Sequence, residues 1–63
     1  MSMYQVQWGR KGKWSRKEFT DRAVATEFCK KTVHECGSME KVILFEKNPN
    51  EELQTIMSMD GLK

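Results

Sequence analysis

Five basic residues surround one tryptophan near the start of the chain. The segment "GRKGKWSRKEF" (residues 9–19) sets Trp14 among a group of cations: Arg10, Lys11, Lys13, Arg16 and Lys17. Such cations neutralise phosphates, and an aromatic ring beside them can stack on an exposed base. They can equally face carboxylates on a protein, with the indole as a desolvated anchor. Edge strands also carry Lys and Arg merely to prevent aggregation. We take these six residues as the predicted binding site.

A metal or nucleophilic site would have to use Cys29, His34 and Cys36. On a helix, Cys29 and Cys36 point the same way but lie about 10.5 Å apart along the axis, at about 1.5 Å per residue. That separation is too long for a disulfide. His34 points about 140° away from Cys29, at about 100° per residue, so the three side chains cannot converge on one ion. We interpret them as two small buried side chains and a surface histidine.

Other catalytic signatures are missing from the sequence. Neighbours such as His34 and Glu35 diverge on a helix and cannot orient one another. There is no glycine-rich phosphate loop, HExxH or GxSxG motif. We therefore expect a non-enzymatic protein that needs neither a cofactor nor a metal.

Length and composition fit one small domain, residues 1–63. A chain of 63 residues buries only about 60% of its unfolded surface, which predicts a small core. No apolar run reaches membrane-spanning length, so we expect no membrane contact. "MSMYQVQW" lacks the apolar stretch of a signal peptide, which predicts a cytoplasmic protein with reduced thiols.

Charge is distributed unevenly along the chain. Residues 1–20 hold five basic residues and one acidic residue, whereas residues 21–63 hold six basic and eight acidic ones. Such asymmetry is typical of an interaction face.

The alternation of "YQVQW" (residues 4–8) predicts a strand, and "GRKG" a turn into a second strand, "KWSRKEFT". If Trp8 pairs with Lys13, Phe19 shares the face of Tyr4, Val6 and Trp8. Trp14, Arg16 and Glu18 then lie on the opposite face with Gln5 and Gln7.

The segment "TDRAVATEFCKKTVHECG" (residues 20–37) predicts a helix. Thr20 or Asp21 can cap its start, and Gly37 can close its end with a positive φ. Apolar or small residues recur at 24/25, 28/29, 32/33 and 36, forming one stripe. We expect Val24 or Ala25, Phe28 and Val33 to pack against the first two strands.

The remainder of the chain begins with a third strand, "KVILFEK" (residues 41–47), whose apolar run implies contact on both faces.

The C-terminal segment "NPNEELQTIMSMDG" (residues 48–61) allows two interpretations. Asn48 as a cap and Pro49 at the first helical position favour a short helix. Alternatively, "ELQTIMS" (residues 52–58) returns from the "NPNE" turn as a fourth strand that pairs with residues 42–47. Residues 59–63 are expected to fray.

These elements predict an α+β fold, a small antiparallel sheet with one packed helix. A right-handed crossover makes the second and third strands parallel, with the first strand between them. The helix covers one sheet face. The apolar run Val42–Phe45 points to both faces, and Trp14 falls on the uncovered one, where we expect Ile56 and Met57 to join it. Unless the C-terminal segment covers it, this surface suits a partner or a homodimer.

Two resemblances bear on the partner. Residues 4–28, "YQVQWGRKGKWSRKEFTDRAVATEF", resemble the hairpin-and-helix part of the arm-type DNA-binding domains of phage integrases, with a similar "GKW…F…A…F" cadence. That family fills the DNA groove with a third strand before the helix, which this chain lacks. In size and element order the whole chain is similar to small phage-encoded proteins that inhibit host RNA polymerase or CRISPR complexes. This resemblance implies a host-cytoplasmic inhibitor.

The sequence thus predicts a small binding module that docks on a larger protein or nucleoprotein, and modulates or inhibits it, through the basic hairpin. The alternative is direct DNA or RNA binding by the same hairpin. A homodimer through the outer sheet face is a third interpretation.

Overall fold

The first two strands form a hairpin with a two-residue turn. In the computed structural model, which describes residues 3–63, β1 spans Met3–Arg10 and β2 spans Lys13–Phe19. Gly12 has φ +85°, a value that a type II turn requires at its third residue. Trp8 pairs with Ser15, not with Lys13 as expected. The two-residue turn is shorter than the predicted "GRKG" loop, and it shifts the register by two.

An even shift leaves every side chain on its expected face. Phe19 lies opposite Tyr4, on the face that Trp8 shares, while Trp14 lies opposite Gly9 on the other face. Gly9 is buried with φ +142°, and a Cβ there would overlap the Lys13 carbonyl oxygen. Glycine at position 9 therefore permits the close approach of the two strands beside the turn.

The helix α1 spans Arg22–Glu35. Of the two expected caps, Asp21 is the one used: its Oδ1 accepts the backbone N–H of Ala23 at 2.8 Å and of Val24 at 3.4 Å. The helix ends at Cys36 in extended conformation. The prediction that Gly37 closes it with a positive φ is wrong, because φ of Gly37 lies outside the left-handed region. No helix within residues 3–63 is long and apolar enough to cross a membrane.

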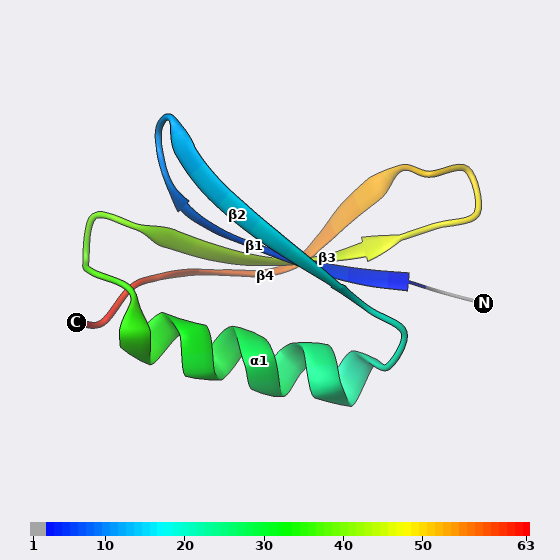
Figure 1. Cartoon of the computed structure of the whole chain (residues 1–63). Coiled ribbons are helices and arrows are strands. Elements are labelled where there is room, and N and C mark those ends of the chain that lie inside the picture. Colours follow the sequence, from blue (N-terminus) through cyan, green and yellow to red (C-terminus); the bar gives the residue numbers. More distant parts are fainter. Residues whose placement is uncertain (1–2) are drawn as a thin grey trace.

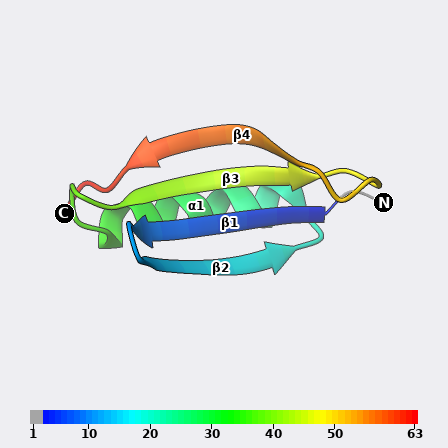
Figure 2. The ribbon, with the colours of Figure 1, turned by 90° about the horizontal axis from the view of Figure 1, so that it is seen from above.

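Two further strands complete the sheet. β3 spans Lys41–Lys47 and β4 spans Leu53–Asp60, and the strand order is β2-β1-β3-β4 with every neighbouring pair antiparallel. This confirms the predicted α+β class and the central place of β1. Figure 2 shows α1 behind the middle of the sheet, so the helix covers one face and leaves the other open.

The core lies between the helix and the middle of the sheet. Its fully or nearly fully buried apolar residues are Val6, Ala25, Cys29, Val33, Cys36, Val42 and Leu44. Phe28 lies at the margin of this core, with its ring centroid 5.3 Å from that of Trp8 and 5.1 Å from that of Phe19. Ala25, rather than Val24, is the buried member of the first helical pair, since Val24 is 52% exposed.

The C-terminal segment is a strand, so of the two interpretations the fourth strand is confirmed. The signals that favoured a helix build the β3–β4 turn instead. The Asn48 Oδ1 accepts the backbone N–H groups of Asn50 at 3.1 Å and Glu52 at 3.0 Å. Glu51 then takes a left-handed φ of 64°, which turns the chain back. An Asn side chain that caps a helix can close a turn by the same kind of bond.

Residues 59–63, which were expected to fray, are all hydrogen-bonded or part of a strand in the structure. Met59 and Asp60 belong to β4. The backbone N–H groups of the next three residues donate 2.9 Å hydrogen bonds to the carbonyls of Glu40, Val33 and Cys36. Gly61 is buried, and a Cβ there would overlap the carbonyl oxygens of Gly37 and Cys36. The tail is therefore held against the end of α1.

Candidate binding surface

The predicted binding residues divide into three locations. Every one of them is exposed. Arg10, Lys11 and Lys13 surround the β1–β2 turn, Trp14 and Arg16 share the outer sheet face, and Lys17 lies on the helix side. The sequence predicted one cluster because the residues are neighbours along the chain. In a strand, neighbours point to opposite faces, and that alternation separates them.

Trp14 is the more exposed of the aromatic side chains on the open face of the sheet. It is 48% exposed. Its cross-strand neighbour is Gly9, which offers no side chain to cover the indole. With Gln7 and Arg16 it lines a shallow hollow in this face. The indole and the guanidinium of Arg16 are therefore presented together to a ligand.

Lys17 is occupied on the opposite side of β2. Its Nζ lies 5.6 Å from the ring centroid of Phe19 and 5.2 Å from that of Phe28. These are cation–π distances, and they bring the ammonium group toward the aromatic margin of the core. The structure does not place Lys17 with Trp14.

The outer face is apolar and amide-rich at its centre. Val42 and Leu44 point inward to the core, so Ile43 and Phe45 alternate onto the outer face, where they are partly exposed. Buried Gln5 lies opposite Phe45, and its Oε1 accepts a hydrogen bond from Gln7 Nε2. The sequence reasoning placed both glutamines on this face but did not expect one of them to be buried.

The C-terminal segment widens the open face and does not cover it. β4 extends the sheet as its last strand beside β3. Ile56 and Met57, which were expected to join the outer patch, pack against the core on the helix side. Ile56 and Met57 are adjacent residues at a β-bulge, where the register between β3 and β4 shifts.

The two ends of the molecule carry opposite charge. The β1–β2 turn is basic through Arg10, Lys11 and Lys13, while the β3–β4 turn contains Glu51 and Glu52. Figure 1 shows both turns rising away from the helix, at opposite ends of the sheet. The open face therefore runs from a basic rim to an acidic rim.

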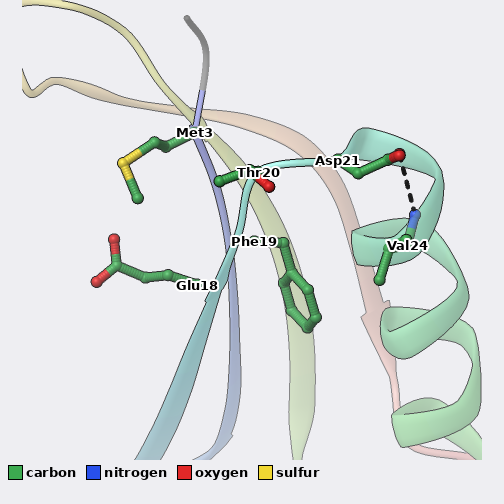
Figure 3. A pocket seen from close by; sticks show the side chains of 6 residues that line it. All are labelled: Met3, Glu18, Phe19, Thr20, Asp21 and Val24. Carbon is green, nitrogen blue, oxygen red and sulfur yellow. Dashed lines mark hydrogen bonds between the residues drawn. The ribbon is translucent and has the colours of Figure 1, made fainter.

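A second hollow lies where β2 meets α1. Its lining residues are Met3, Glu18, Phe19, Thr20, Asp21 and Val24. Figure 3 shows Phe19 and Val24 on the helix side and Met3 and Glu18 on the other side of the strand. The carboxylate of Asp21 is already bonded to the helix N-terminus. No set of polar groups in this hollow converges on a common point.

The two thiols are poorly suited to nucleophilic chemistry. Cys29 and Cys36 are free and buried. Burial raises the pKa of Cys29. Burial, followed by a hydrogen bond to Glu40 and the negative charges of Glu40 and Glu35, raises the pKa of Cys36 from 9.0 to about 11. A reactive cysteine requires the opposite shift. Within residues 3–63, no three His, Cys, Asp or Glu residues are grouped so as to hold a metal ion.

Comparison of the chain with family models, with curated proteins and with solved structures finds no match. The case for a function therefore depends on the exposed indole, its basic neighbours and the open sheet face.

Proposed function

We propose that the protein is a non-enzymatic binding module that docks on a larger protein, and modulates or inhibits it, through the Trp14 side of the β1–β2 hairpin. One observation carries the proposal. Trp14 is 48% exposed beside Arg16, on a sheet face that α1 does not cover.

An indole in this position is suited to be an interface anchor. Trp and Arg are the residue types most enriched among side chains that dominate binding energy. A tryptophan side chain has only two rotatable torsions, so little conformational entropy is lost when a partner covers it. Ile43 and Phe45 add apolar surface on the same face, on β3, beyond Gln7 and Gln5 of β1. A complementary surface would desolvate all three side chains together.

The distribution of charge favours a protein partner that carries carboxylates. A nucleic acid binds through many phosphates along an extended basic track. In this protein only three exposed cations surround the β1–β2 turn, and Lys17 points to the helix side of the sheet. The β3–β4 turn at the other end of the sheet is acidic. A folded partner can present acidic groups to the turn alone and an apolar patch to Trp14. Nucleic-acid binding by the same hairpin is the alternative, supported by the exposed aromatic beside the basic turn.

A photo-crosslinking amino acid at position 14 tests the docking face. The matched control carries it at position 24, because Val24 is similarly exposed but lies on the helix. Both proteins are incubated with nuclease-treated lysate of the cells that produce the protein. We expect one discrete protein adduct from position 14 that is missing from position 24. Equal adducts from both positions, or none from position 14, would contradict the proposal.

Affinity measurements with the identified partner then separate the contribution of the Trp14 side chain from that of the basic residues at the turn. We expect Trp14→Ala to weaken binding at least about 30-fold, equivalent to about 2 kcal/mol. Lys11→Glu with Lys13→Glu should mainly slow association in a salt-dependent way. Lys30→Glu with Lys31→Glu, an equal charge change on exposed positions of the helix, is the control.

Labelled single-stranded and duplex oligonucleotides test the alternative. If the wild-type protein binds them tightly, with a steep salt dependence that the hairpin charge reversal removes, the nucleic-acid function replaces the proposed one.

A further inference from the structure

The two edges of the sheet differ in how they are protected. β2 carries four charged residues among its seven, and such charges discourage pairing with another strand. β4 has none from Leu53 to Met59, and its one charged residue is the last, Asp60. It also has no proline. The edge formed by β4 is therefore open to pairing with another strand.

The backbone of β4 has free hydrogen-bonding groups along its outer side. The strand is eight residues long and pairs with β3 on one side only. Figure 2 shows no other segment beside it. In an antiparallel sheet, alternate N–H and C=O groups of an edge strand point away from its neighbour. These outward groups are therefore available for pairing with a further strand.

The helix leaves apolar side chains of β4 incompletely covered. α1 packs chiefly against β1, β3 and β2. Ile56, Met57 and Met59 point to the helix side and touch the core, yet each remains partly exposed. A strand added beside β4 would bring new apolar surface next to them.

The bulge makes β4 complementary to a second copy of itself. On β3, Leu44 pairs with Met57, but the next residue, Phe45, pairs with Thr55. Ile56 is therefore the extra residue of the bulge. Both Ile56 and Met57 contact the core. An antiparallel pair centred between Ile56 and Met57 sets Ile56 against the partner's Met57, on the helix side in both copies. It also sets Thr55 against the partner's Ser58, both on the open face. Every opposed pair in this register shares a face, as sheet geometry requires.

We propose that two copies of this chain pair through β4 about a two-fold axis, forming a continuous eight-stranded antiparallel sheet. The interface is isologous, since the same strand serves on both sides. A single pair of edge strands is smaller than a standard interface, so the dissociation constant is expected on the order of 10–100 µM. The two β2 strands become the outer edges, and the Trp14 surfaces stay free.

Sedimentation velocity over a micromolar-to-millimolar concentration series tests the pairing. The wild-type protein should shift from monomer to dimer. Thr55→Lys with Ser58→Lys places like charges opposite each other twice in the dimer, and should weaken it at least tenfold. Both positions are exposed, so thermal unfolding of the dilute monomer should change little. Ser15→Lys with Ser38→Lys adds the same charge at exposed positions away from β4 and should leave the dimer intact.

A charge swap tests the register. Thr55→Lys with Ser58→Glu sets opposite charges against each other, and should restore the dimer to within a few-fold of wild type. Intermolecular NOEs between β4 backbones, in a mixture of labelled and unlabelled wild-type protein, give a readout that needs no variant.

A wild-type protein that stays monomeric throughout the series would overturn the proposal. So would a dimer that survives Thr55→Lys with Ser58→Lys but is lost on Trp14→Ala, since the open sheet face would then be the contact. The proposal is independent of the docking function, because the β4 variants should keep the crosslink from position 14.

Discussion

Replacing Phe28 by alanine should remove much of the stability of this domain. The Phe28 ring contacts two aromatic rings, Trp8 at 5.3 Å and Phe19 at 5.1 Å, and Lys17 Nζ lies 5.2 Å from its centroid. Partial burial of the side chain contributes about 1–2 kcal/mol, and the two aromatic pairs contribute about 0.5–1.5 kcal/mol each. The expected loss is therefore about 3 kcal/mol.

That loss is large for a chain of this size. At about 0.05–0.15 kcal/mol per residue, 63 residues give a free energy of unfolding of about 3–9 kcal/mol. Thermal unfolding followed by circular dichroism should show a fall in Tm of more than about 10 °C, since each kcal/mol corresponds to about 4–8 °C. Val24→Ala on the exposed side of the helix is the control, with an expected change below about 0.5 kcal/mol.

An unchanged Tm for folded Phe28→Ala would refute the packing described for α1. It would mean that the aromatic cluster does not join the helix to the β1–β2 hairpin. Phe28→Leu separates the contribution of apolar burial from that of the aromatic pairs, because it keeps most of the apolar volume and loses both ring pairs. Its expected cost is about 1–2 kcal/mol.

Three further changes should be measurable by chemical denaturation. Glu51→Gly should stabilise the domain by about 0.5 kcal/mol, because a left-handed φ of 64° is costly for glutamate, whereas Glu52→Gly should not. Gly61→Ala should destabilise it by about 2 kcal/mol, because the new methyl group displaces the tail and its backbone hydrogen bonds; an unchanged midpoint would contradict this. The pKa of the Cys36 thiol is about 11 in the folded protein and about 9 in the unfolded chain, so the folded state holds more protons between these values. Stability should therefore fall from pH 9 to pH 11 by on the order of 1–2 kcal/mol more than in Cys36→Ala.

The pattern of side-chain faces was predictable because it depends only on the parity of positions. The alternation of Tyr4, Val6 and Trp8 fixes their common face, and Phe19 joined them although the register was two residues away from the expected one. Trp14 fell on the open face for the same reason. The register itself depends on the turn, and "GRKG" allows turns of more than one length.

Local sequence could not decide between helix and strand after Asn48. Its side chain can satisfy backbone N–H groups at a helix start or in a turn, and here it does the latter. What decides the outcome is the edge of β3, which residues 53–60 cover, and that pairing partner is absent from any local window. The sequence reasoning also grouped Arg16 and Lys17 at one site because they are adjacent in sequence. In the strand they point to opposite faces of the sheet.

The strand order has a consequence for how the chain folds. The β1–β2 and β3–β4 pairings each join neighbours in sequence, so each hairpin can form early by closing a short loop. The β1–β3 pairing instead joins Gly9 to Lys41 and Met3 to Lys47, across the whole helix. That single non-local step should limit the folding rate. Substitutions where β1 meets β3, at Val6 or Leu44, should slow folding, whereas changes in the β3–β4 turn should mainly alter unfolding.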